Sequence, residues 1–106
     1  MVYIRKQILI INNDPVFCQT LQDTLQDDLT DILYMQSSKE ALASFMEENY
    51  CLVILDIQLS DMNGMDLLRT LRHTKYTPIP ALTEPLDIDG QIALLLSGAD
   101  AFLKNQ

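Results

Sequence analysis

The stretch that most constrains the fold is Leu52–Asp56, which reads Leu-Val-Ile-Leu-Asp. Four consecutive apolar residues predict a short strand that is buried on both faces, as the strands of parallel sheets are. Asp56 ends this run, and polar loop residues follow at once. Open α/β sheets place their ligand crevices at the carboxyl ends of their strands. We therefore expect Asp56 to lie where a chain of this class binds or reacts.

Apolar runs and helical patterns alternate along the whole chain. The predicted strands are 7–11, 32–35, 52–56, 78–83 and 101–103. The predicted helices run from about 15 to 28, 38 to 50, 64 to 74 and 88 to 96. This alternation, with no repeat or linker, requires a parallel sheet with helices on both faces. The predicted fold class is therefore α/β, a doubly wound sheet of five strands.

Local signals mark where the first two helices begin. Asp14 can cap the first helix while Pro15 occupies its first turn, where the missing N–H costs nothing. Ser37 and Glu40 have the spacing of a capping box for the second helix. The residues expected to form the buried face of that second helix are Leu42, Phe45 and Met46.

Composition narrows the class of protein. A chain of 106 residues with 48% hydrophobic and 21% charged residues is one globular domain. The net charge of −8 argues against this domain gripping nucleic acid or an anionic membrane by itself. No apolar run approaches the roughly 20 residues that span a bilayer. Cys18 and Cys51 lack metal-type spacing and are expected to be packing residues, so a cytoplasmic location is expected.

Four segments together resemble the receiver domain of bacterial two-component response regulators, across essentially all of 1–106. They read ILIINNDP at 8–15, LVILDIQLSDMNGMDLL at 52–68, TPIPALT at 77–83 and GADAFL at 98–103. The resemblance implies a flavodoxin-like sheet of order 2-1-3-4-5. No helix pattern follows Leu103, so the fifth helix is expected to be missing or truncated. An output module, if any, would lie outside this chain.

The resemblance also implies the role of three residues. Asp56 matches the aspartate that accepts a phosphoryl group from a histidine kinase or a phosphotransfer protein. Thr83 matches the hydroxyl residue that closes onto the phosphoryl group, and Phe102 matches the aromatic switch residue that turns with it. Read without the resemblance, Asp56 is a capping carboxylate, Thr83 a strand end and Phe102 a core residue.

The resemblance implies a Mg²⁺ ion as well, and here the sequence departs from the family pattern. The metal ligands by position are Asp56, Asn12, Asn13 and the backbone carbonyl of Gln58. Asn12 and Asn13 stand where the family has an acidic pair, and each lost carboxylate removes an attraction on the order of a few kcal/mol. The site of the family's Lys falls on Asn105, with Lys104 adjacent. Mg²⁺ is therefore expected from the family but weakened or lost here, with Asn12 and Asn13 acting as turn residues.

Two functions from different classes remain open. In the first, phosphorylation of Asp56 switches the surface of the fourth helix and last strand and so controls an output module. In the second, an atypical receiver with an impaired pocket is a constitutive interaction or dimerisation module, a homodimer being one option. Neither is an enzyme beyond assisting its own phosphorylation and dephosphorylation. Neither contacts nucleic acid or a membrane through this domain.

Two unrelated classes fit the residues poorly. A flavin-binding flavodoxin relative would need the hydroxyl- and glycine-rich amides that cradle a phosphate, and the loop at 12–15 lacks them. A phosphatase of the haloacid dehalogenase type needs a second aspartate two residues after its nucleophile. Gln58 stands at that position instead.

Overall fold

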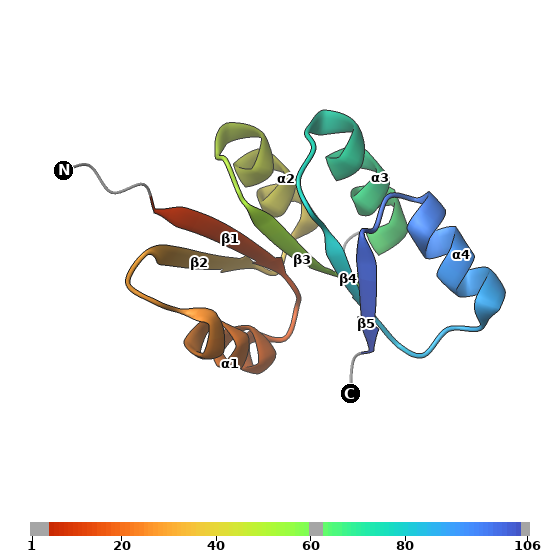
Figure 1. Cartoon of the computed structure of the whole chain (residues 1–106), viewed down its shortest axis with the longest axis horizontal. Coiled ribbons are helices and arrows are strands. Elements are labelled where there is room, and N and C mark those ends of the chain that lie inside the picture. The colour runs from red at the N-terminus through yellow and green to blue at the C-terminus, as the bar shows by residue number, and fades with distance from the viewer. Residues whose placement is uncertain (1–4, 60–62, 105–106) are drawn as a thin grey trace.

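A computed structural model of the chain describes residues 5–59 and 63–104, and these form one parallel sheet of five strands between helices (Figure 1). The strands lie in the order β2-β1-β3-β4-β5, which confirms the predicted flavodoxin-like arrangement. The elements are β1 (Lys6–Ile11), α1 (Pro15–Leu25), β2 (Thr30–Met35), α2 (Ser38–Glu47), β3 (Leu52–Asp56), α3 (Gly64–Thr74), β4 (Pro80–Thr83), α4 (Ile88–Leu96) and β5 (Ala101–Lys104).

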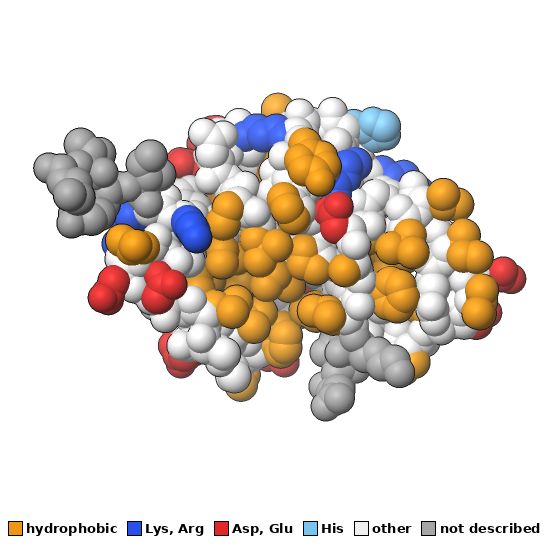
Figure 2. Space-filling view, viewed as in Figure 1, with side chains coloured by type: hydrophobic (Ala, Val, Ile, Leu, Met, Phe, Trp, Pro, Cys, Tyr) orange, Lys and Arg blue, Asp and Glu red, His pale blue; other side chains and the backbone are white. Residues whose placement is uncertain are grey.

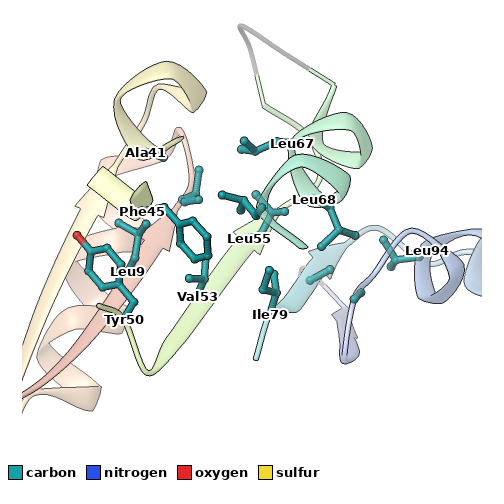
Figure 3. Close-up of a cluster of buried hydrophobic side chains, with 14 residues drawn as sticks. Leu9, Ala41, Phe45, Tyr50, Val53, Leu55, Leu67, Leu68, Ile79 and Leu94 are labelled. Carbon is teal, nitrogen blue, oxygen red and sulfur yellow. The ribbon is translucent and has the colours of Figure 1, made fainter. Parts of the chain in front are cut away.

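Two apolar clusters hold the layers together. The larger lies between the sheet and α2, α3 and α4, where Figure 3 shows Phe45 and Leu68 packed over the strand residues Val53 and Leu55. The smaller lies between the sheet and α1, with Ile10, Ile32, Ile54 and Leu82 around the buried thiol of Cys18. The sheet therefore has a well-covered face and a face on which α1 is the one helix of the described residues (Figure 1).

The helix starts follow the predicted capping chemistry. Asp14 Oδ1 accepts the N–H groups of Val16 and Phe17 at 3.0 and 3.3 Å. Ser37 Oγ accepts the N–H of Glu40 at 3.3 Å. Each side chain thus satisfies donors that the first helical turn leaves without an intrahelical acceptor.

Three details of the helix predictions are wrong. Helix α2 ends at Glu47 rather than near residue 50, because Glu48 already has extended backbone angles. Met46 is 60% exposed, and Ala41 instead joins Phe45 in the buried face of α2. Successive helix residues are about 100° apart, so a residue next to Phe45 can turn away from the core. Helix α1 ends at Leu25 rather than near residue 28, because Gln26 already has extended backbone angles.

β4 begins at Pro80, two residues later than predicted. As the first residue of the strand, Pro80 does not interrupt a ladder with its missing N–H. The chain before it is tied down in other ways: the carbonyl of Pro78 accepts the N–H of Val53, and the N–H of Ile79 donates to the carboxylate of Asp100. This arrangement carries the chain into the part of β4 that reaches the site.

The sheet face beside α1 is only partly covered. Figure 2 shows hydrophobic side chains gathered over the strands between α1 and β5. Ile8 and Leu52 are half-buried there, and Leu103, which pairs with Leu82, is 52% exposed. Residues 5–59 and 63–104 contain four helices, as expected for this fold without its fifth helix. None of the described helices is long and apolar enough to cross a membrane.

Candidate functional site

Three polar residues lie at the carboxyl ends of neighbouring strands. Asn12 follows β1, Asp56 ends β3 and Thr83 ends β4. The register places Ile11 beside Leu55, and the central strand contacts both of its neighbours. Asn12, Asp56 and Thr83 are 2%, 5% and 6% exposed, although all three are polar. A buried polar cluster of this kind needs internal hydrogen bonds, and it has them.

Asp56 accepts a hydrogen bond on each of its carboxylate oxygens. Oδ1 accepts the backbone N–H of Gln58 at 2.9 Å, and Oδ2 accepts the amide Nδ2 of Asn12 at 3.1 Å. The other end of the same amide, Asn12 Oδ1, accepts the N–H of Asp14 at 2.7 Å. A carboxylate only accepts and a backbone N–H only donates, so these two partners fix which end of the amide faces Asp56.

The environment disfavours the charged form of Asp56. Burial raises the pKa of its carboxyl group, the negative charge of Glu84 raises it further, and the N–H of Gln58 acts in the opposite direction. Sequence reasoning missed Glu84, although its position directly after Thr83 was a usable signal. The site therefore holds one buried carboxylate with an acidic neighbour.

The raised pKa gives a prediction about stability. Between the ordinary and the raised pKa, the folded protein binds more protons at Asp56 than the unfolded chain does. Stability at this site is therefore lost as the pH rises through that interval, and it stays lower above it. We expect Asp56→Asn to be more stable than wild type at neutral pH and to lose this advantage in acid. Urea unfolding of both proteins across that range tests this, and a difference independent of pH would contradict it.

The two predicted switch residues lie on adjoining strands. Thr83 Oγ1 donates to the backbone carbonyl of Glu84 at 3.1 Å. Phe102 is half-buried against the larger core cluster and pairs with Ala81, two residues before Thr83. Thr83 is thus at the carboxyl end of β4, whereas Phe102 lies two positions before the end of β5, and the hydroxyl of Thr83 bonds to the backbone of the next residue.

The remaining predicted site residues lie further from Asp56 or outside the described residues. The side chains of Asn13 and Gln58 are exposed, and Gln58 reaches Asp56 through its backbone. Lys104 is the last residue of β5 and is opposite Thr83 in register. Asn105 is outside the described residues, so the prediction that it replaces the family's Lys stays a prediction.

The donors around Asp56 do not fit the Mg²⁺ that the resemblance implies. Mg²⁺ favours a near-octahedral shell of oxygens that includes carboxylates. Asp56 is the one buried carboxylate of the site, the amide of Asn12 presents its nitrogen and not its oxygen to Asp56, and the carboxylate of Asp14 caps α1. Within residues 5–59 and 63–104, no group of three His, Cys, Asp or Glu side chains is placed to hold a metal ion.

Ile57 and Gln58, which follow Asp56, are held against the start of α3. The N–H of Gly64 donates to the carbonyl of Ile57 at 3.2 Å, and Gln58 forms an isolated bridge with Asn63. Asn63 also caps α3 by accepting the N–H of Met65 at 2.8 Å. The backbone donor that serves Asp56 is thus part of a segment anchored by α3.

Known proteins resemble this chain over nearly all of its length. The sequence pattern of the response regulator receiver domain matches residues 8–106. Regulatory protein VanRB of Enterococcus faecalis is 35% identical over 97 residues, which make up 92% of this chain and 44% of that protein. The chain thus spans less than half the length of the curated relatives it matches.

Solved structures agree with the sequence comparison. A two-component response regulator from Clostridium difficile superposes with a TM-score of 0.88 at 30% identity, covering 95% of this chain and 84% of that one. A response regulator from Burkholderia pseudomallei superposes with a TM-score of 0.85 at 25% identity, covering 94% of this chain and 59% of that one. The latter was crystallised with a phosphorylated aspartic acid, a calcium ion and citrate.

Proposed function

This chain belongs to the response regulator receiver domains, and we propose that it is the phosphorylation-controlled input domain of a two-component signalling protein, with Asp56 as the phosphoryl acceptor. The observation that carries the proposal is the buried carboxylate of Asp56 at the end of the central strand, between Asn12 and Thr83. The phosphorylated aspartic acid in the similar Burkholderia pseudomallei protein supports it.

The proposed reaction is a single phosphoryl transfer. A carboxylate oxygen of Asp56 forms a bond to phosphorus while the bond between phosphorus and the donor breaks. With a phosphohistidine donor, the imidazole nitrogen leaves with the electron pair, and the product is an acyl phosphate on Asp56. The backbone N–H of Gln58 and the Asn12 amide hold the carboxylate for this attack. The donor is a histidine kinase or a phosphotransfer protein.

The signal then passes to the surface of α4 and β5. The hydroxyl of Thr83 exchanges the carbonyl of Glu84 for the phosphoryl group, and Phe102 turns as Thr83 moves. Phe102 lies on β5, which contacts α4, and Thr83 lies on the neighbouring strand β4, so their movement changes that surface. Phosphorylation shifts the population between two states because it makes contacts that only one of them offers. An output module or a partner protein on this face reads the shift.

The test is phosphorylation by a small donor. We expect incubation with acetyl phosphate or phosphoramidate to add the mass of one phosphoryl group to the wild-type chain and none to Asp56→Ala. Intact-mass spectrometry with and without Mg²⁺ measures both. An Asp56→Ala protein that is labelled as strongly as wild type would overturn the assignment.

A second function is favoured by one observation, the Asn12 amide on Asp56. Because that hydrogen bond already satisfies the carboxylate, the same fold could serve as a constitutive interaction or dimerisation module. This candidate predicts no phosphoryl adduct under any metal condition. It also predicts an oligomeric state or partner affinity that Asp56→Ala leaves unchanged, which light scattering measures.

A further inference from the structure

We infer that Asn12 is a positioning residue that stands, at Asp56, in the place of a divalent cation, so that this pocket holds its carboxylate by a neutral amide and binds Mg²⁺ only weakly. The inference deepens the proposed function, because it rests on Asp56 being the working group of the site. It concerns how the site is held rather than whether it is phosphorylated.

Both ends of the Asn12 side chain form hydrogen bonds within the fold. Nδ2 donates to Asp56 Oδ2 at 3.1 Å, and Oδ1 accepts the N–H of Asp14 at 2.7 Å. Rotating the amide to offer its oxygen to a cation would set two oxygens against each other at Asp56. It would also set two donors against each other at Asp14. Asn12 is 2% exposed, so water cannot relieve either contact.

The backbone carbonyl of Asn12 also has a hydrogen-bond partner. Its carbonyl accepts a hydrogen bond from the Cys18 thiol, with a sulfur-to-oxygen distance of 3.6 Å. A thiol is a weak donor, and this one is fully buried against the carbonyl. The carbonyl oxygen of Asn12 therefore already accepts a hydrogen bond within the fold.

The site offers a cation only one buried carboxylate. The carboxylate of Asp14 accepts two N–H groups at the start of α1, which leaves Asp56 as the one buried acid of the site. A doubly charged ion with a strong preference for carboxylate oxygens would find one such group, with both of its oxygens hydrogen-bonded. A single buried carboxylate supplies too few ligands to complete the shell of a divalent cation. A neutral hydrogen-bond donor such as the Asn12 amide suits it better.

The experiment compares thermal stability with and without Mg²⁺ in wild type, Asn12→Asp and Asn49→Asp. A ligand that binds the folded state raises the melting temperature, so wild type is expected to show no rise up to about 10 mM Mg²⁺. Asn12→Asp sets a second carboxylate against Asp56, so it should melt lower without metal and recover with it. Its Mg²⁺ affinity should exceed that of wild type by tenfold or more.

Asn49→Asp is the matched control. It makes the same chemical change at an exposed residue before β3, at the opposite edge of the sheet from Asp56. It should respond to Mg²⁺ as wild type does. A metal-dependent gain in Asn49→Asp equal to that in Asn12→Asp would overturn the inference, because the effect would then follow net charge alone.

A second measurement stands even if Asn12→Asp does not fold. In NMR titrations of wild type with Mg²⁺, the amide signals of Asp56 and Gln58 should not shift in a saturable way. Saturable shifts in wild type would overturn the inference. None of these experiments uses a phosphodonor. A wild-type chain that fails to be phosphorylated would therefore count against the proposed function and not against this inference.

Discussion

Gly64→Ala is expected to lower the free energy of unfolding by about 1–3 kcal/mol or more, the usual cost of overpacking a tight contact. A methyl group at this position would lie 2.2 Å from the carbonyl oxygen of Ile57 and 2.5 Å from its Cα. These are backbone atoms, so the start of α3 must move away from the segment that follows Asp56. The better helix propensity of Ala, worth up to about 1 kcal/mol, cannot offset a clash of that depth. Urea unfolding measures the loss.

The same change should also disturb the site. Moving α3 breaks the Gly64–Ile57 hydrogen bond and shifts the segment that carries the N–H of Gln58 onto Asp56. Gly90→Ala is the matched control, because Gly90 also lies in a first helical turn but would meet side-chain atoms at 3.1 Å or more. Its expected effect is within about 1 kcal/mol. Equal losses in the two variants would contradict this account.

Arg72→Met is expected to lower the free energy of unfolding by about 1.5–3 kcal/mol, the range for hydrogen bonds to charged groups. The guanidinium joins α3 to the segment before β4 and to the segment between α4 and β5. It donates to the carbonyls of Thr77 and Gly98, at 3.0 Å and at 2.6 and 2.9 Å, and it pairs with Asp100. Met keeps the aliphatic stem but leaves these carbonyls without their donor. Thermal or urea unfolding measures the effect.

The control for Arg72 lies on the same helix. Arg69 pairs with Asp66 one turn away, and both side chains are more than half exposed. Exposed pairs of this kind contribute about 0–1 kcal/mol, so Arg69→Met should unfold nearly as wild type does. Arg72→Lys keeps the charge but not the planar fork of donors, and it should recover only part of the loss. Full recovery by Lys would show that charge, not geometry, holds the three segments.

Much of the fold was predictable because local chemistry and global pattern agree. The apolar run that ends at Asp56 does form the central strand, and Asp14 with Pro15 does start the first helix. Strand order followed from the family resemblance. Element ends were less predictable, since residues such as Gln26 leave the helix for backbone reasons that no side-chain pattern records.

Sequence spacing did not show which helix face would meet the sheet in α4. The regular stripe of Ile88, Ile92 and Leu95 is 70%, 49% and 44% exposed, whereas Leu94 between them is 1% exposed. A helix at the edge of a sheet packs through a narrow contact, so one residue can satisfy it while an apolar stripe remains outside. Sequence spacing also does not show which groups a side chain will reach in the fold. Arg72 was not predicted to matter because the carbonyls that it binds lie in loops.

The strand order places Asn12, Asp56 and Thr83 at the ends of neighbouring strands, as the topology requires. The hydrogen bonds that these residues form could not be predicted from the sequence. That the Asn12 amide would point its nitrogen at Asp56 depends on the N–H of Asp14, which only the folded loop positions. The influence of Glu84 on Asp56 likewise depends on the path of the chain after β4.

Asp56 is the residue proposed to carry the phosphoryl group, and residue-level mapping tests this most directly. After treatment with a small phosphodonor, borohydride reduces an acyl phosphate to an alcohol and so converts a phosphorylated aspartate to homoserine. We expect peptide mass spectrometry to find homoserine at position 56, and only in protein that was exposed to the donor. Homoserine at another aspartate, or a phosphoryl group on a different residue with Asp56 unchanged, would contradict the account.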